Sequence, residues 1–133
     1  MPRSTPLAIF AAFLSVSQPS LSAPWSYTCE VKHVYSLADD ASLGTSGFEK
    51  TMKGGNFSVS REGGEIVGEV VSTLGAKATR VVNRGSTENS FKTVADFDGQ
   101  IQILEVQEFQ KGMIKPFIAM SMGGAGVITG TCK

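Results

Sequence analysis

The two cysteines are the residues of this chain whose types most directly suggest chemistry. Cys29 lies in the stretch YTCE and Cys132 in the stretch GTCK, close to the C-terminus. A redox-active pair usually stands close together, as in Cys-x-x-Cys, and that spacing is absent. One histidine and two paired cysteines do not form a zinc site either. We therefore predict a structural disulfide between Cys29 and Cys132, which requires the two ends of the domain to meet.

His33 is the only histidine and the only candidate for a histidine general base. Serines and aspartates that could complete a nucleophile–histidine–carboxylate triad are plentiful, but the chain has no Gly-x-Ser-x-Gly elbow. We expect a buried or rim histidine that is hydrogen-bonded to backbone or to Tyr35. An enzyme that uses His33 as its base is kept as an alternative hypothesis.

Met120 and Met122, in the stretch MSM, point the same way if this segment is a strand. Thioether sulfur is a soft ligand that selects Cu(I), so a weak copper site is a second alternative. Methionine more often fills irregular gaps in a core or lines an adaptable surface. The glycine-rich stretch GGAGVITG has no helix behind it and predicts no nucleotide site. We expect neither a metal nor a cofactor.

The first residues are typical of a secretory signal peptide. Arg3 gives a positive start, residues 7–16 are apolar, and small residues precede Ala23, the first residue after the expected cleavage site. The apolar run is too short to span a bilayer. We therefore predict a signal peptide over residues 1–22 and a single β-domain over residues 23–133 that is secreted or periplasmic. Such a compartment is oxidising, which suits the predicted disulfide.

The charge balance argues against two classes of partner. The chain has 12 basic and 12 acidic residues, so it lacks the basic field that nucleic-acid binding requires. It also has no polybasic segment for an anionic membrane. No stretch after the signal peptide is long and apolar enough to cross a bilayer. We expect no nucleic-acid partner and no stable membrane insertion after cleavage.

Residues 25–37 alternate with a period of two, which predicts a strand with one buried face. The residues expected on that buried face are Trp25, Tyr27, Cys29, Val31, His33, Tyr35 and Leu37. On this interpretation Val34 is the exception, because it is the one large apolar residue on the polar face.

The rest of the chain is also strand-like. Residues 48–52 predict a short strand, and residues 57–71 predict a hairpin. The strongest signal is Asp98-Gly99 between two apolar runs, because this dipeptide favours a two-residue hairpin turn. In the second run the alternating apolar residues move from odd positions (Ile101 and Ile103) to even positions (Leu104 and Val106). This change predicts a bulge near Ile103.

No segment has helical periodicity over eleven or more residues. Strands and turns at this spacing predict an all-β fold, a small antiparallel barrel or sandwich of about seven or eight strands. Its ends would be joined by one disulfide. A partly closed barrel is favoured because most connections are short.

A small β-domain without a catalytic motif is most simply a non-enzymatic binding module for a protein partner or a small apolar ligand. Its ligand-binding candidates are Trp25, Tyr27, His33 and Tyr35, which with several phenylalanines could line a barrel mouth. The competing interpretation is that these aromatic residues fill the core. A further alternative is an envelope structural protein that acts through an edge strand and forms oligomers.

Overall fold

The computed structural model describes residues 25–122 and 126–133. The predicted signal peptide, residues 1–22, lies outside these residues. The described chain forms nine strands and one short helix. In chain order they are β1 (Ser26–Leu37), β2 (Leu43–Thr45), α1 (Glu49–Met52), β3 (Asn56–Ser60), β4 (Ile66–Gly68), β5 (Ala78–Arg84), β6 (Phe91–Asp96), β7 (Ile101–Val106), β8 (Lys115–Met122) and β9 (Gly126–Cys132).

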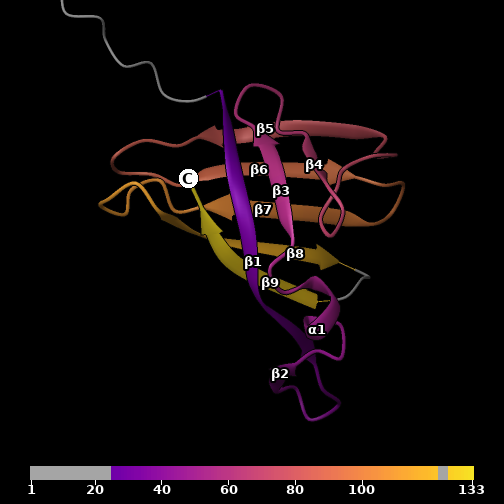
Figure 1. Ribbon diagram of the computed structural model, residues 1–133. Helices are drawn as coiled ribbons and strands as arrows, with labels where there is room; N and C mark the ends of the chain where they lie inside the picture. The colour runs from indigo at the N-terminus through magenta and orange to yellow at the C-terminus, as the bar shows by residue number, and fades with distance from the viewer. Residues whose placement is uncertain (1–24, 123–125) are drawn as a thin grey trace, which may run out of the picture.

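All the strands belong to one antiparallel sheet with the order β4-β3-β1-β9-β8-β7-β6-β5, and β2 pairs only with β1. The sheet curls into a half-barrel, so that β1 and β3 cross over β6, β7 and β8 (Figure 1). The end strands β4 and β5 do not pair with each other. The prediction of a small, partly closed antiparallel barrel is confirmed.

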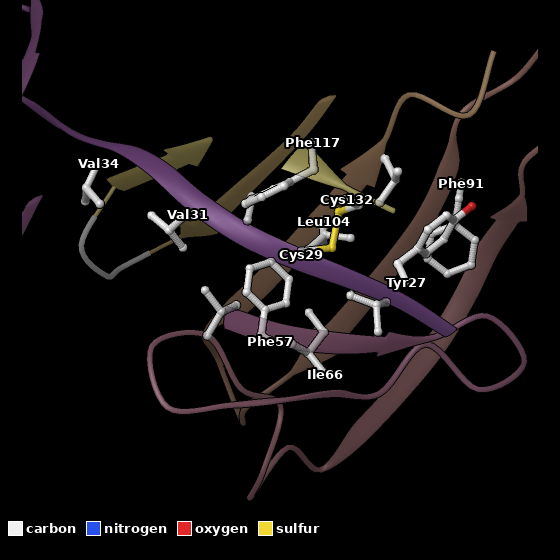
Figure 2. Packing of buried hydrophobic residues seen from close by; sticks show 14 residues of the cluster. Tyr27, Cys29, Val31, Val34, Phe57, Ile66, Phe91, Leu104, Phe117 and Cys132 are labelled. Atoms are coloured by element: carbon white, nitrogen blue, oxygen red, sulfur yellow. A yellow bond between two sulfur atoms is a disulfide. The ribbon is translucent and has the colours of Figure 1, made fainter. Parts of the chain in front are cut away.

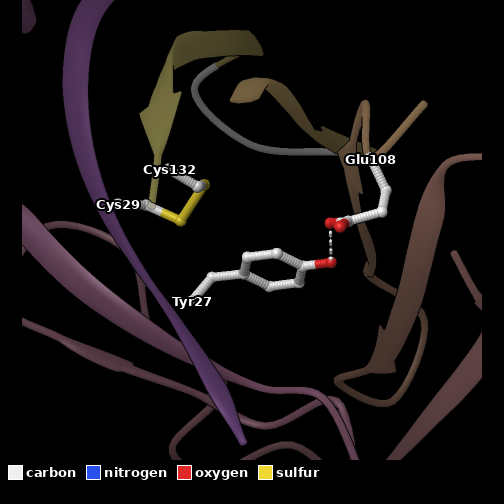
Figure 3. Close-up of a disulfide and its surroundings, with 4 residues drawn as sticks. All are labelled: Tyr27, Cys29, Glu108 and Cys132. Atoms are coloured by element: carbon white, nitrogen blue, oxygen red, sulfur yellow. Dashed lines mark hydrogen bonds between the residues drawn. A yellow bond between two sulfur atoms is a disulfide. The ribbon is translucent and has the colours of Figure 1, made fainter. Parts of the chain in front are cut away.

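The predicted disulfide is present and joins the two ends of the domain. Cys29 lies directly opposite Cys132 on neighbouring strands, and the two are 103 residues apart in sequence. Two backbone hydrogen bonds of 2.9 Å join Thr28 and Lys133. The adjacent residues Cys29 and Cys132 therefore form a non-hydrogen-bonded pair, in which facing side chains lie close together. Both cysteines are buried (Figure 3).

The prediction that one face of residues 25–37 is buried throughout is wrong after Val31. Val31 pairs with Gly130, but the next pair is His33 with Thr129, so Lys32 is an extra residue in β1. This bulge reverses the alternation. Val34 is therefore buried, whereas His33 and Leu37 are exposed.

Gly130 lies where β1 and β9 approach closely, next to this bulge. A Cβ atom at this position would lie 2.0 Å from the carbonyl oxygen of Glu30 and 2.6 Å from the ring of Phe117. Only glycine avoids the contact with the backbone oxygen. The Phe117 ring covers the space that a side chain would need.

The core lies between the β1–β3 layer and the strands behind it (Figure 2). Tyr27 packs against Phe91 with ring centroids 5.3 Å apart. Phe57 and Phe117 meet edge to face at 5.2 Å. Each aromatic side chain buries a large apolar area, which matters in a core of this size. The interpretation of most aromatic residues as core therefore holds for Tyr27, Phe57 and Phe91.

The predicted β6–β7 hairpin is confirmed, but the bulge near Ile103 is not. Asp98 and Gly99 have φ values of 64° and 107°, as a tight two-residue turn requires. The register between β6 and β7 runs without interruption, and so does the register between β7 and β8. Leu104 therefore points into the core and Ile103 points out of it. The apolar phase shifts because both faces of β7 carry apolar residues.

Two other local predictions have different outcomes. The 57–71 hairpin is confirmed as β3 and β4, although the second strand ends at Gly68. The prediction of a short strand over residues 48–52 is wrong, because Glu49–Met52 form α1 with Phe48 as its N-cap. The Glu49 carboxylate holds this turn against β1, where it accepts a hydrogen bond from the backbone N–H of Val34 at 3.1 Å.

Candidate functional site

The structure does not bring the four ligand-binding candidates together. Tyr27 is buried in the core, and Trp25 is 79% exposed before the start of β1, so the prediction that Trp25 is buried is wrong. His33 and Tyr35 lie after the bulge and point to the outer face of the sheet. These four residues therefore do not line a common barrel mouth.

Tyr27 belongs to a polar network at the edge of the core. Its hydroxyl donates to Glu108 Oε2 at 2.5 Å (Figure 3), and the Arg61 guanidinium lies 4.6 Å from its ring centroid. Arg61 also lies 3.9 Å from the Glu108 carboxylate. Burial raises the pKa of Tyr27 above its ordinary value, and the Glu108 hydrogen bond adds to this shift while Arg61 opposes it. The three groups therefore contact one another at the edge of the core.

This network predicts a loss of stability in alkali. The pKa of Tyr27 is higher in the folded than in the unfolded protein, where it is about 10, so its contribution is complete below that pH and is lost as pH rises above it. We expect the free energy of unfolding of the wild type to fall more steeply above about pH 10 than that of Tyr27→Phe. Urea unfolding followed by circular dichroism at several pH values would measure both slopes.

Tyr35→Phe is the matched control, because Tyr35 is only half-buried on the outer face. It should keep the steep alkaline slope of the wild type. Parallel pH profiles for the wild type and Tyr27→Phe would contradict the expected role of the Tyr27 hydroxyl.

His33 is a surface residue with two close neighbours. Its ring stacks on Tyr35 with centroids 5.9 Å apart, and its Nδ1 lies 3.9 Å from Glu49 Oε2. Thr129 is its cross-strand partner on β9. The expected rim position is therefore correct, but the contact with Tyr35 is ring stacking rather than the expected hydrogen bond, and the expected inward direction is wrong. A catalytic role for His33 stays a prediction, with Glu49 as the group that would orient the imidazole.

The structure describes the side chain of only one of the two methionines of the predicted Cu(I) site. Met120 lies on the outer face of β8 and is 40% exposed. The side chain of Met122 lies outside the described residues, so the Cu(I) hypothesis stays a prediction. Among the residues that the structure describes, no three His, Cys, Asp or Glu side chains gather as a metal site would require.

The outer face of the sheet carries a continuous row of apolar side chains. Their register positions are directly opposite one another across five neighbouring strands: Val94 on β6, Ile103 on β7, Met120 on β8, Val127 on β9 and Tyr35 on β1. We call these five residues the outer row. All five are half-buried or exposed, and none belongs to the buried core. A sheet face turned to water normally carries polar residues at such positions.

Polar groups and a hollow adjoin the outer row. In the next row, Lys92 and Glu105 approach to 3.9 Å, and Ile118, Thr129 and His33 continue across the sheet. The last three residues line a surface hollow of about 470 Å³. An apolar row with charged and polar neighbours on one side and an adjoining hollow has features of a protein-interaction surface.

Two further spaces adjoin the sheet. A half-open pocket of about 200 Å³ lies between the β7–β8 region and the segment before β5, next to Val70, Gln102 and Ala119. Typical small-molecule sites measure about 300–1,000 Å³. A second, open groove of about 590 Å³ runs along β4, where Val67 and Leu74 are exposed. The first space is small for a ligand and the second is a surface feature.

Sequence reasoning missed the outer row, although it did note one of its signals. Ile101 and Ile103 are apolar at positions out of phase with Leu104 and Val106. That pattern alone predicts a bulge, whereas in the fold it arises because β7 has a second apolar face. Joining Ile103 to Met120 and Val127 also requires the strand order, which the sequence alone does not provide.

No helix within residues 25–122 or 126–133 has the length and apolar character needed to cross a membrane. The disulfide is compatible with an oxidising compartment. Comparison of the chain with models of protein families, with curated proteins and with solved structures finds no match in any of the three.

Proposed function

We propose that this protein is an exported, non-enzymatic binding domain that holds a protein partner on the outer face of β6 to β9 and β1. The observation that carries the proposal is the outer row, in which five apolar side chains adjoin one another on a face that the core does not use. Isolated exposed apolar residues are normal, but a contiguous patch with a polar rim favours a partner.

The described interior supports a protein partner better than a small apolar ligand. The core cluster fills the space under β1 and β3, and the pocket of about 200 Å³ beside Ala119 is below the usual ligand range. The larger hollows, of about 470 and 590 Å³, lie on the surface, where a protein partner could cover them.

Two features support export. The first is the basic, apolar and small-residue pattern of residues 1–22. The second is the disulfide, which forms and persists in oxidising compartments. The host's envelope and secreted fractions are therefore where the partner should be sought.

Charging the outer row should abolish partner capture. The bait is the protein recovered after export, and it is compared with its Ile103→Arg/Met120→Arg variant, whose altered side chains are both partly exposed. A partner of the outer face should be depleted about tenfold or more on the variant, because each arginine would be buried unpaired in the interface. Quantitative mass spectrometry of the retained envelope proteins would measure this ratio.

Val67→Arg is the matched control, since Val67 is 72% exposed on β4, away from the outer row. It should retain the partner as the wild type does, and all three proteins should have similar melting temperatures. A protein set retained equally by the wild type and the outer-row variant would refute the proposal.

A further inference from the structure

The hairpin of β1 and β2 leaves the body of the sheet as a projecting arm (Figure 1). We define the arm as residues 36–45, and every one of these residues is exposed. Leu37 and Leu43 are direct cross-strand partners on one face of the arm, with 69% and 59% of their surfaces exposed. An isolated two-stranded hairpin is at best marginally stable in water. The arm therefore lacks the third strand or apolar cover that such a hairpin needs.

The free edge of β2 is unprotected in a way that the other edges are not. The edge strand β5 carries Arg80 and Arg84 and has a bulge at Val82, both of which discourage pairing with another strand. The β4 edge is partly covered, because Thr73 N–H donates to the Ile66 carbonyl oxygen at 2.9 Å. β2 consists of Leu43, Gly44 and Thr45, without charge, proline or bulge.

The charges at the two ends of the arm are opposite. Asp39 and Asp40 form the tip, and Lys50 and Lys53 lie at the base, in and just after α1. All four are exposed, and none takes part in an ion pair within the described chain. The hydrogen bonds from the Ser42 hydroxyl and backbone N–H hold the pKa of Asp40 below its usual value and so favour its charged form.

We propose that the arm is a dimerisation element whose occupant is the arm of a second copy of this chain. The two β2 edges pair antiparallel about a twofold axis at Gly44, so that Leu43 of each copy lies opposite Thr45 of the other. A four-stranded sheet β1-β2-β2-β1 results, and the leucine pairs of the two arms lie side by side on it. Such self-complementary twofold contacts are the commonest form of oligomer.

Charge complementarity is the reason to choose a second copy as the occupant. Antiparallel pairing about Gly44 places the start of β2 in one copy, which follows the acidic tip, beside the end of β2 in the other copy, which leads to α1. The tip with Asp39 and Asp40 therefore lies toward the base with Lys50 and Lys53, twice in each dimer. Glu49 does not oppose this contact strongly, because its carboxylate turns back to Val34 N–H and His33. A β5–β5 contact would instead place arginines together.

The contact is small, so the dimer should be weak and salt-sensitive. Interfaces that bury less than about 1,200 Å² are typical of transient complexes. We expect a monomer–dimer equilibrium in the micromolar range or weaker, shifted toward monomer at high salt because exposed charge pairs are screened. Sedimentation velocity of the exported protein over a range of concentrations would measure it.

Charge exchange between tip and base gives the decisive test. Asp39→Lys/Asp40→Lys and Lys50→Glu/Lys53→Glu should each raise the dissociation constant about tenfold or more, because like charges then face each other in each homodimer. An equal mixture of the two variants should dimerise again, since every tip in the mixed dimer meets a base of opposite charge. The tip-to-base arrangement therefore predicts recovery in the mixture but not in either variant alone.

Arg80→Glu/Arg84→Glu is the control, and it should dimerise as the wild type does because β5 takes no part. All the altered residues are exposed, so circular dichroism and melting temperature should be unchanged in all variants. A wild type that stays monomeric at several hundred micromolar, a mixture that stays monomeric or a β5 variant that loses the dimer would each overturn the proposal.

Discussion

Replacing both cysteines with alanine is expected to lower the free energy of unfolding by up to about 4.7 kcal/mol, the chain-entropy value for a loop of about one hundred residues. The bridge spans 103 residues and therefore restricts almost the whole unfolded domain. Small domains have a total stability of about 5–15 kcal/mol, so this loss approaches the threshold of unfolding. Urea unfolding followed by circular dichroism would measure the difference between Cys29→Ala/Cys132→Ala and the wild type.

Chemical reduction of the wild type supplies the matched control, because it removes the same bond without changing a side-chain volume by much. Reduced protein and double variant should unfold at similar urea concentrations, both well below that of the oxidised protein. Peptide mapping without reductant should recover Cys29 linked to Cys132 beforehand. A loss of less than about 1 kcal/mol would show that the bridge does not limit the unfolded chain as expected.

The disulfide and the β6–β7 hairpin were both predictable from the sequence, for different reasons. A chain with only two cysteines allows only one intramolecular pairing, and an oxidising compartment was the expectation from residues 1–22. Asp98-Gly99 favours the turn locally, because both residue types readily adopt the positive φ that a two-residue hairpin turn requires. Neither inference requires knowledge of a distant strand.

The bulge at Lys32 depends on a distant partner, and for that reason the alternation of β1 did not predict it. The bulge lies next to the pair of Val31 and Gly130, where β9 approaches β1 closely. Gly130 permits this approach because it has no side chain. Only Val34, apolar on the otherwise polar face, signalled it. The consequence for the site is large, since the bulge moves His33 and Tyr35 from the core to the outer face.

The outer row also depends on contacts between strands that are distant in sequence. Each member is one apolar residue on a strand, and a single exposed apolar residue does not by itself indicate an interaction surface. Their meaning comes from the strand order, which makes Ile103, Met120 and Val127 neighbours. Fold class could therefore be predicted from periodicity, whereas the candidate interaction face required the register of five strands.

The direction of the β7 side chains can be tested by two truncations at adjacent positions. Leu104 is completely buried and Ile103 is 38% exposed on the opposite face. Leu104→Ala should destabilise the domain by about 2–5 kcal/mol, because it leaves a cavity between the two layers. Ile103→Ala should cost about 1 kcal/mol or less, mainly through lost strand propensity and partial burial. Equilibrium unfolding in urea would give both values.

The pair is well matched because both substitutions remove the side chain beyond Cβ from an aliphatic residue of equal composition, in the same strand. Similar slopes of free energy against urea would show that neither variant changes the surface exposed on unfolding. Equal losses for Ile103→Ala and Leu104→Ala would mean that both side chains are in the core, as a bulge would place them. The outer row would then lose its central member, and the proposed partner surface would have to be abandoned with it.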